Sequence, residues 1–151
     1  MSDIIFTTKV LWSQIDANMH MRHSAYADLG AQARLEVMQD KGFTSEMMRK
    51  YMIGPILFRE ELLYKKEIRP NETVGVTCKL SRCRQDGSRW SIRHEIFKEN
   101  GELAAIINAD GAWIDQIRRK LAPLPEDFAT RLLTLDKIGR ASCRERVSSP
   151  V

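Results

Sequence analysis

Residues 12–38 read WSQIDANMHMRHSAYADLGAQARLEVM, and this stretch decides how the rest of the chain is interpreted. Asp16, His20 and His23 stand ahead of the longest helical pattern in the sequence. An apolar segment at 6–15 predicts a first strand, and Ser24 is predicted to cap the helix that follows. A helix N-terminus offers free N–H donors and positive potential. Acid–base groups on this turn therefore indicate a reaction centre.

The helix is unusual for its small residues. A glycine inside a helix costs about 1 kcal/mol relative to alanine, so Gly30 predicts close approach to another backbone, as a sheet wrapped around the helix would require. Gly42 is predicted to end the helix. One helical face carries, at helical spacing, Tyr26, Leu29, Gly30, Ala33 and Val37.

The remainder of the chain reads mainly as strands. The order is a strand, a long helix, a short helix, four strands joined largely by hairpins and a terminal helix. This order is typical of the α+β class with an antiparallel sheet, and not of alternating βαβ units. The short helix is expected at 44–51, the strands at 56–68, 74–80, 90–96 and 103–114, and the last helix from about Pro125.

Length and composition predict one globular domain. With 151 residues and 43% hydrophobic content, the chain can bury a core, and residues 1–136 are assigned to a single domain. No apolar run reaches the roughly 18 residues of a membrane helix, and no signal peptide is recognised. The three cysteines lack metal-ligand spacing, so we expect reduced thiols in a cytoplasmic protein.

Residues 137–151 are set apart as a non-native-looking tail that is predicted to be disordered, because they show no apolar period. From Lys137 onward there are four basic residues and one acidic residue. Without them the net charge falls from +4 to about +1. A basic nucleic-acid-binding arm would rest almost wholly on these residues, so no nucleic-acid or membrane partner is expected.

The opening stretch resembles the acyl-CoA thioesterases of the 4-hydroxybenzoyl-CoA thioesterase type. Their pattern is an aspartate, a histidine four residues on, paired asparagines and a tyrosine ten residues after the aspartate; Asp16, His20 and Tyr26 stand at these places. Arg22-His23 replaces the asparagine pair, although other members carry a histidine seven residues after the aspartate, where His23 stands. The segments DGSRWSIRHEIF at 86–97 and GELAA at 101–105 also resemble the family.

This resemblance, which covers 6–121, implies a hotdog fold, in which an antiparallel sheet wraps around a long central helix. It implies hydrolysis of acyl-CoA or acyl carrier protein thioesters to a free acid and a thiol. It also implies a homodimer or homotetramer in which the sheets of two subunits join and the sites lie between them. No cofactor is expected beyond the coenzyme A of the substrate.

Thioester hydrolysis needs a nucleophile or base and stabilisation of the oxyanion. Asp16 can attack the carbonyl or activate water, and His20 or His23 can orient Asp16, position water or donate to the carbonyl. The backbone N–H groups of His23, Ser24 and Ala25 can polarise the carbonyl. Weaker candidates for substrate binding are Tyr26, Glu60, Arg89 and Arg93, and further basic residues that can meet phosphates are Arg118, Arg119 and Lys120.

Other interpretations stay open from the sequence. Asp16 can simply form an Asx-type turn, and the spacing of Tyr26 and His94 suits core residues. Two histidines near an aspartate also suggest a metal site, but the cluster lacks a convincing third ligand. At the level of function, the alternatives are a hotdog hydroxyacyl-thioester dehydratase and a non-catalytic acyl-thioester-binding module.

Overall fold

The computed structural model describes residues 3–144, and for residues 138–144 the backbone alone. The chain forms two compact units, each assembled from three separate stretches. Unit 1 comprises Met1–Val37, Glu61–Cys78 and Arg93–Asn108, and unit 2 comprises Met38–Glu60, Lys79–Ile92 and Ala109–Val151.

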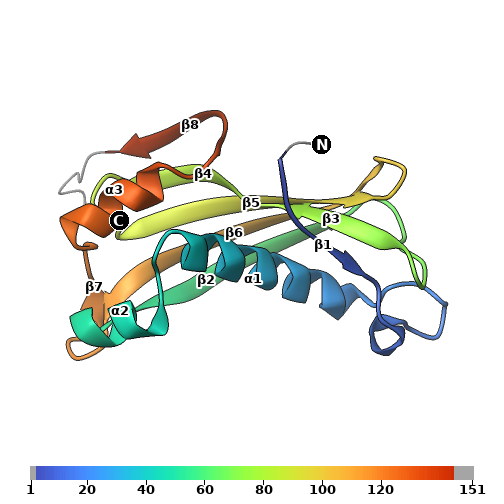
Figure 1. Ribbon diagram of the computed structural model, residues 1–151, viewed down its shortest axis with the longest axis horizontal. Coiled ribbons are helices and arrows are strands. Elements are labelled where there is room, and N and C mark those ends of the chain that lie inside the picture. Colours follow the sequence, from blue (N-terminus) through green and yellow to red (C-terminus); the bar gives the residue numbers. More distant parts are fainter. Residues whose placement is uncertain (1–2, 145–151) are drawn as a thin grey trace. The chain divides into compact units, whose positions relative to one another are not determined.

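The order of helices and strands agrees with the α+β prediction (Figure 1). The helices are α1 (His23–Asp40), α2 (Ser45–Tyr51) and α3 (Glu126–Leu133), with a 3-10 turn at Trp12–Gln14. The strands are β1 (Ile4–Lys9), β2 (Ile53–Tyr64), β3 (Thr73–Thr77), β4 (Lys79–Arg84), β5 (Arg89–Lys98), β6 (Leu103–Asp115), β7 (Lys120–Leu121) and β8 (Lys137–Arg144).

The strands pair into one sheet with a branched order. One path runs β1-β3-β5-β4-β8, and β6 pairs with β2, β5 and β7. The β1–β3, β3–β5 and β6–β7 pairs are antiparallel. The antiparallel pairing therefore agrees with the prediction, but β2 pairs with β6 and not with the next strand along the chain, and β4 and β8 run parallel.

The first strand is shorter than the sequence predicts. It ends at Lys9, and the last apolar residues of the predicted strand enter the 3-10 turn instead. The Gln14 side chain accepts the Leu11 N–H at 2.9 Å while the Gln14 N–H donates to the Leu11 carbonyl at 2.9 Å. This closed turn leaves Trp12 88% exposed, so its apolar side chain does not enter the core.

The strand predicted at 74–80 is divided into β3 and β4 at Cys78. Next to Cys78, hydrogen bonds that involve side chains replace the backbone hydrogen bonds between the strands. The Thr77 carbonyl accepts from His94 Nδ1 at 2.8 Å, and the Thr77 hydroxyl accepts the Glu95 N–H at 2.8 Å. Thr77 is therefore joined to β5 by these bonds after the regular β3–β5 register ends at Val76.

The tail prediction is wrong for residues 137–144, which form β8 beside β4. A strand edge offers unpaired N–H and C=O groups with which an extended segment can pair. Residues 145–151 lie outside the described residues. Cys83 of β4 is disulfide-bonded. The expected reduced thiol is therefore found at the buried Cys78 and not at Cys83.

Helix α1 ends as predicted at Gly42. The Gly42 N–H donates to the Gln39 carbonyl at 3.1 Å, and the Phe43 N–H donates to the Met38 carbonyl at 2.8 Å. Gly42 has φ +86°, so this is a Schellman motif. In unit 2 the Phe43 ring then packs on Trp113 and Phe128, with ring centroids 5.3 and 5.4 Å away.

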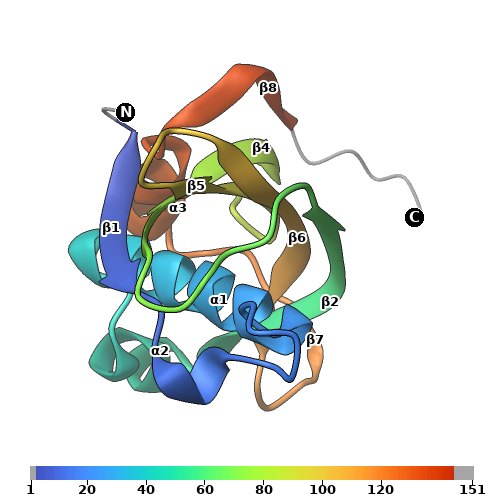
Figure 2. The ribbon, with the colours of Figure 1, turned by 90° about the vertical axis from the view of Figure 1, so that its right-hand side faces the viewer.

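In unit 1 the small face of α1 packs tightly on the sheet, but the atoms that crowd Gly30 belong to side chains and not, as the sequence predicted, to another backbone. Figure 2 shows the strands of this unit curving around one side of α1. Ala25 and Ala33 are fully buried. A Cβ added at Gly30 would lie 3.0 Å from Ile107 Cδ1 and 3.2 Å from His94 Cδ2. Only a residue without a side chain allows this approach unless its neighbours move.

Replacing Gly30 with valine is expected to lower the free energy of unfolding by roughly 1–3 kcal/mol, as overpacking of a filled core does. Denaturant unfolding measures this change. The matched control is Ala31→Val on the exposed part of the same helix, which costs less than about 1 kcal/mol. Shortening the contacting side chain with Ile107→Val should recover part of the loss. Equal losses in the Gly30 and Ala31 variants would contradict the packing argument.

Candidate active site

The turn before α1 is closed by backbone hydrogen bonds in unit 1. Ile15 and Met21 form an isolated antiparallel bridge, and the Asp16 N–H donates to the His20 carbonyl at 2.9 Å. The Met19 N–H donates back to the Asp16 carbonyl at 3.0 Å. This network fixes the backbone on both sides of Asp16, so the position of its carboxylate is fixed by the turn.

The Asp16 carboxylate is half-buried, and its two oxygens differ in the hydrogen bonds that they accept. Oδ1 accepts the N–H of Asn18 at 2.9 Å and the N–H of His20 at 3.2 Å. The Asx-turn interpretation of Asp16 is therefore confirmed for Oδ1. Among the described residues, no hydrogen bond to Oδ2 is found. The turn thus holds one oxygen while the other remains available for chemistry.

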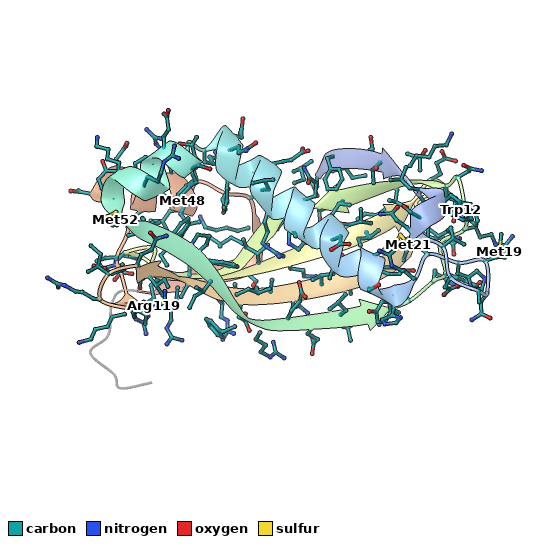
Figure 3. The ribbon with its side chains drawn as sticks, turned by 90° about the horizontal axis from the view of Figure 1, so that it is seen from below. Trp12, Met19, Met21, Met48, Met52 and Arg119 are labelled. Atoms are coloured by element: carbon teal, nitrogen blue, oxygen red, sulfur yellow. The ribbon has the colours of Figure 1, made fainter. Side chains whose placement is uncertain are left out.

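Met19 has a backbone conformation that the sequence analysis did not anticipate. Its φ is +62°, in the left-handed region that costs a residue with a side chain roughly 1–2 kcal/mol. The side chain is exposed, and Figure 3 shows Met19 and Trp12 beyond Met21 at the N-terminal end of α1. Such strain persists only when the surrounding bonds hold it in place, and here the turn bonds around Asp16 do so.

The first turn of α1 differs from the prediction in two details. The helix begins at His23, so Ser24 lies inside the first turn and is not the N-cap. Its hydroxyl instead accepts from Arg22 Nε at 3.0 Å, and Arg22 Nη1 donates to the Ser13 carbonyl at 2.7 Å. The Ala25 N–H already donates to the Arg22 carbonyl at 3.0 Å. Ala25 is thereby removed from the predicted carbonyl-polarising set, and the N–H groups of His23 and Ser24 remain.

Two tyrosines lie against this end of the helix. Tyr26 is buried, and its ring meets the Tyr64 ring edge-on with centroids 5.0 Å apart. Burial, followed by the charges of Tyr64, Asp16 and Glu67, raises the pKa of Tyr26, and a hydrogen bond with the Ile68 backbone opposes this rise. The Tyr26 hydroxyl therefore stays protonated beside the carboxylates. Tyr64 donates to the His23 carbonyl at 3.3 Å.

His20 pairs with a residue that the sequence analysis did not select. Its Nε2 contacts the Glu67 carboxylate, and Tyr64 was likewise not proposed for this site. The sequence predicted a strand that continues to Ile68. In such a strand the side chains alternate, so Glu67 was expected on the face opposite to Tyr64. Because β2 ends at Tyr64, that alternation does not apply to Glu67. No feature of the sequence pairs Glu67 with His20.

The weaker binding candidates do not all belong to the unit that holds Asp16. Arg93 is in unit 1, where its Nη2 lies 3.5 Å from Glu95 Oε2, so part of its charge is compensated. Glu60 and Arg89 belong to unit 2, where the Arg89 guanidinium lies 5.6 Å from the centre of the Phe58 ring. Their roles, and those predicted for the basic residues at 118–120, remain predictions.

His94 is a core histidine, as its spacing suggests. It is fully buried, its Nδ1–H donates to the Thr77 carbonyl, and its Nε2 lies 3.0 Å from Arg34 Nη1. Since arginine only donates, the proton must be on Nδ1. Burial, together with the Arg34 charge, lowers the pKa of His94 from 6.5 to about 4, against the hydrogen bond to Thr77, which raises it.

This pKa predicts a pH dependence of stability. Between pH 6.5 and about 4 the unfolded chain binds a proton that folded His94 does not, so the free energy of unfolding falls as the pH is lowered through this window. The expected contribution is roughly 3 kcal/mol. Urea unfolding at several pH values, compared between the wild type and His94→Gln, isolates the effect. Identical pH slopes for the two proteins would show that His94 does not cause it.

Within residues 3–144, no three histidine, cysteine or acidic side chains gather as metal ligands would. The described helices also include none that is both long and apolar enough to span a membrane. The structure therefore brings together the carboxylates of Asp16 and Glu67, His20, two tyrosines and the free N–H groups at the start of α1, whereas His23 is exposed and contributes backbone groups.

Comparison with known families shows the class of protein to which the chain belongs. The profile of the thioesterase-like superfamily matches residues 10–132, and the chain belongs to this superfamily. Its α+β architecture, with a curled antiparallel sheet and a long helix, is the hotdog fold. The match includes Asp16 and the whole of α1, which confirms the family resemblance inferred from the sequence.

Similar solved structures agree with this fold. The hypothetical protein SAV2348 from Staphylococcus aureus, solved in complex with CoA, has a TM-score of 0.80 at 21% identity, covering 85% of this chain and 80% of that one. The 1,4-dihydroxy-2-naphthoyl-CoA thioesterase Slr0204 from Synechocystis gives 0.77 at 15% identity, with 86% and 95% covered. A DHNA-CoA thioesterase from S. aureus gives 0.71 at 26% identity, with 79% and 78% covered. Comparison with proteins of curated function gives no significant match.

Proposed function

We propose that this protein hydrolyses acyl thioesters, with Asp16 as the catalytic carboxylate. The observation that carries the proposal is the asymmetric bonding of Asp16. Two backbone N–H groups hold Oδ1, so Oδ2 can face a substrate without loss of the turn. Membership of the thioesterase-like superfamily supports this reaction class.

Oxyanion stabilisation is assigned to the start of α1. The N–H groups of His23 and Ser24 are among the first in the helix, where donors lack intrahelical partners and the dipole favours negative charge. A thioester carbonyl that accepts from them becomes more electrophilic, and they stabilise the charge that develops on its oxygen. Asp16 then either attacks the carbonyl carbon or takes a proton from attacking water. The thiolate leaves without needing a strong acid.

The thiol carrier that we propose is coenzyme A. The support is that one similar structure was solved in complex with CoA and others are described as CoA thioesterases. Coenzyme A enters as part of the substrate, and the proposed reaction uses no further cofactor. An acyl carrier protein carries the same kind of thioester, so assays with both carriers distinguish the two.

Replacing Asp16 with asparagine is expected to lower kcat at least about 100-fold, because an amide neither attacks the carbonyl nor accepts a proton well. The fold should persist, since the asparagine Oδ1 still accepts from the turn. Thiol release from a panel of acyl-CoAs, followed by colorimetric thiol detection, measures the change.

Asp28→Asn is the matched control, because Asp28 is an exposed aspartate on α1 and its substitution should leave kcat unchanged. Undiminished turnover in Asp16→Asn would remove Asp16 from the mechanism. Tight acyl-CoA binding without turnover of any thioester by the wild type would favour a binding module instead. Loss of water from a hydroxyacyl thioester without thiol release would indicate a dehydratase.

We also propose that the chain acts as a homodimer or an assembly of dimers joined along β2. Among the described strands, β2 pairs only with β6, so one of its edges is open. In unit 2 this strand exposes three neighbouring apolar side chains, Ile56, Leu57 and Phe58, of which Phe58 is 55% exposed. A long, apolar strand with an open edge is a ready site for pairing with a second chain.

Phe58→Glu is expected to convert the assembly into a 17.4 kDa monomer, because the substitution brings charge to a surface that pairing would bury. Analytical ultracentrifugation measures the mass. Leu35→Glu changes an exposed apolar residue on α1 instead and should leave the mass unaltered. A wild-type protein that sediments as a monomer at micromolar concentration would refute pairing along β2.

A further inference from the structure

Glu67 and His20 form a carboxylate–imidazole pair next to the catalytic carboxylate. His20 Nε2 contacts Glu67 Oε2, and the two side chains are 36% and 57% exposed. Isolated surface pairs of this exposure stabilise a fold by at most about 1 kcal/mol. The small gain in stability therefore does not explain the pair well. Its position beside Asp16 suggests a functional role instead.

Backbone bonds hold both partners. On the His20 side, the His20 N–H donates to Asp16 Oδ1 at 3.2 Å. On the other side, the Glu67 carbonyl accepts from Lys98 Nζ at 2.9 Å. The Met21 N–H donates to the Ile68 carbonyl at 2.7 Å, which ties the residue after His20 to the residue after Glu67. The pair thus lies between two segments that are already joined.

The pairing decides which nitrogen of His20 carries the proton. A neutral imidazole has one N–H donor and one lone pair, and an ionised carboxylate only accepts. Glu67 therefore selects the tautomer with hydrogen on Nε2 and a lone pair on Nδ1. Carboxylates that orient an active-site histidine in this way act through the histidine and do not touch the substrate.

We propose that Glu67 is a positioning residue that fixes His20 so that Nδ1 accepts a hydrogen bond from the hydrolytic water. That water donates one hydrogen bond to His20 Nδ1 and the other to Asp16 Oδ2, and Asp16 takes the second proton as the water oxygen bonds to the acyl carbon. This inference rests on the proposed hydrolysis and assigns a separate role to each of the three residues. Asp16 acts on the reacting atoms, His20 orients the water, and Glu67 sets the tautomer of His20.

The kinetic test compares Glu67→Ala with Glu102→Ala. Glu102 is a similarly exposed glutamate of unit 1 that is paired with Lys66, and its loss should leave kcat unchanged. Glu67→Ala is expected to lower kcat about 10- to 100-fold with KM changed less than twofold, and added acetate should restore part of the rate. In a His20→Ala background Glu67→Ala should have no further effect, because residues that act through one another are not additive. Unaltered kcat, or an equal loss in both backgrounds, would overturn the proposal.

A second measurement does not depend on turnover. Imidazole ¹⁵N shifts at pH 8.5, assigned by comparison with His20→Ala, should show hydrogen on Nε2 of His20 in the wild type and a mixture of tautomers in Glu67→Ala. Hydrogen on Nδ1 in the wild type would refute the proposal even in a protein that cleaves thioesters. The expected tautomer in a protein without thioesterase activity would refute the proposed function and, with it, the role of His20 in orienting water.

Discussion

The close contact between Gly30 and the sheet is the constraint on which the rest of unit 1 depends. With Ile107 Cδ1 only 3.0 Å from where a Cβ would stand, α1 can approach its strands only along its small face. That contact fixes the axial position of the helix and its rotation. The N-terminus of α1, and with it the N–H groups of His23 and Ser24, is thereby placed by packing almost two turns away. The packing of the core thus determines where the N–H groups that we propose as carbonyl-polarising donors lie.

A second constraint acts locally, at the turn that leads into α1. Asp16 is both a structural and a proposed reactive residue, because one carboxylate oxygen completes the turn while the other makes no bond among the described residues. This arrangement explains why the structural and functional interpretations of Asp16 are not alternatives. It also explains how the turn tolerates the left-handed backbone of Met19. The bonds that hold the carboxylate hold the strained residue as well.

Periodicity and turn chemistry predicted most of the elements. Helical spacing and Gly42 located α1 to within two residues, and small residues indicated its tight packing. The predictions failed where local hydrogen bonds determine the backbone and the apolar pattern of the sequence does not. Gln14 closes a turn that ends β1 early, and Thr77 exchanges ladder bonds for side-chain bonds and so divides a strand. The spacing of Asp16, His20 and Tyr26 indicated the site, but Glu67 could not be found in this way. It follows the end of β2, where alternation no longer determines the direction of a side chain.

The exposure of Trp12 has a practical consequence. The other two tryptophans, Trp90 and Trp113, are 7% and 1% exposed, whereas Trp12 is 88% exposed and lies four residues before Asp16. An aqueous quencher such as iodide therefore reaches one indole and leaves the other two emitting. The quenchable part of the intrinsic fluorescence reports on the surroundings of the turn that holds Asp16 alone, without any label. The molecule thus carries its own optical probe for anything that covers this turn.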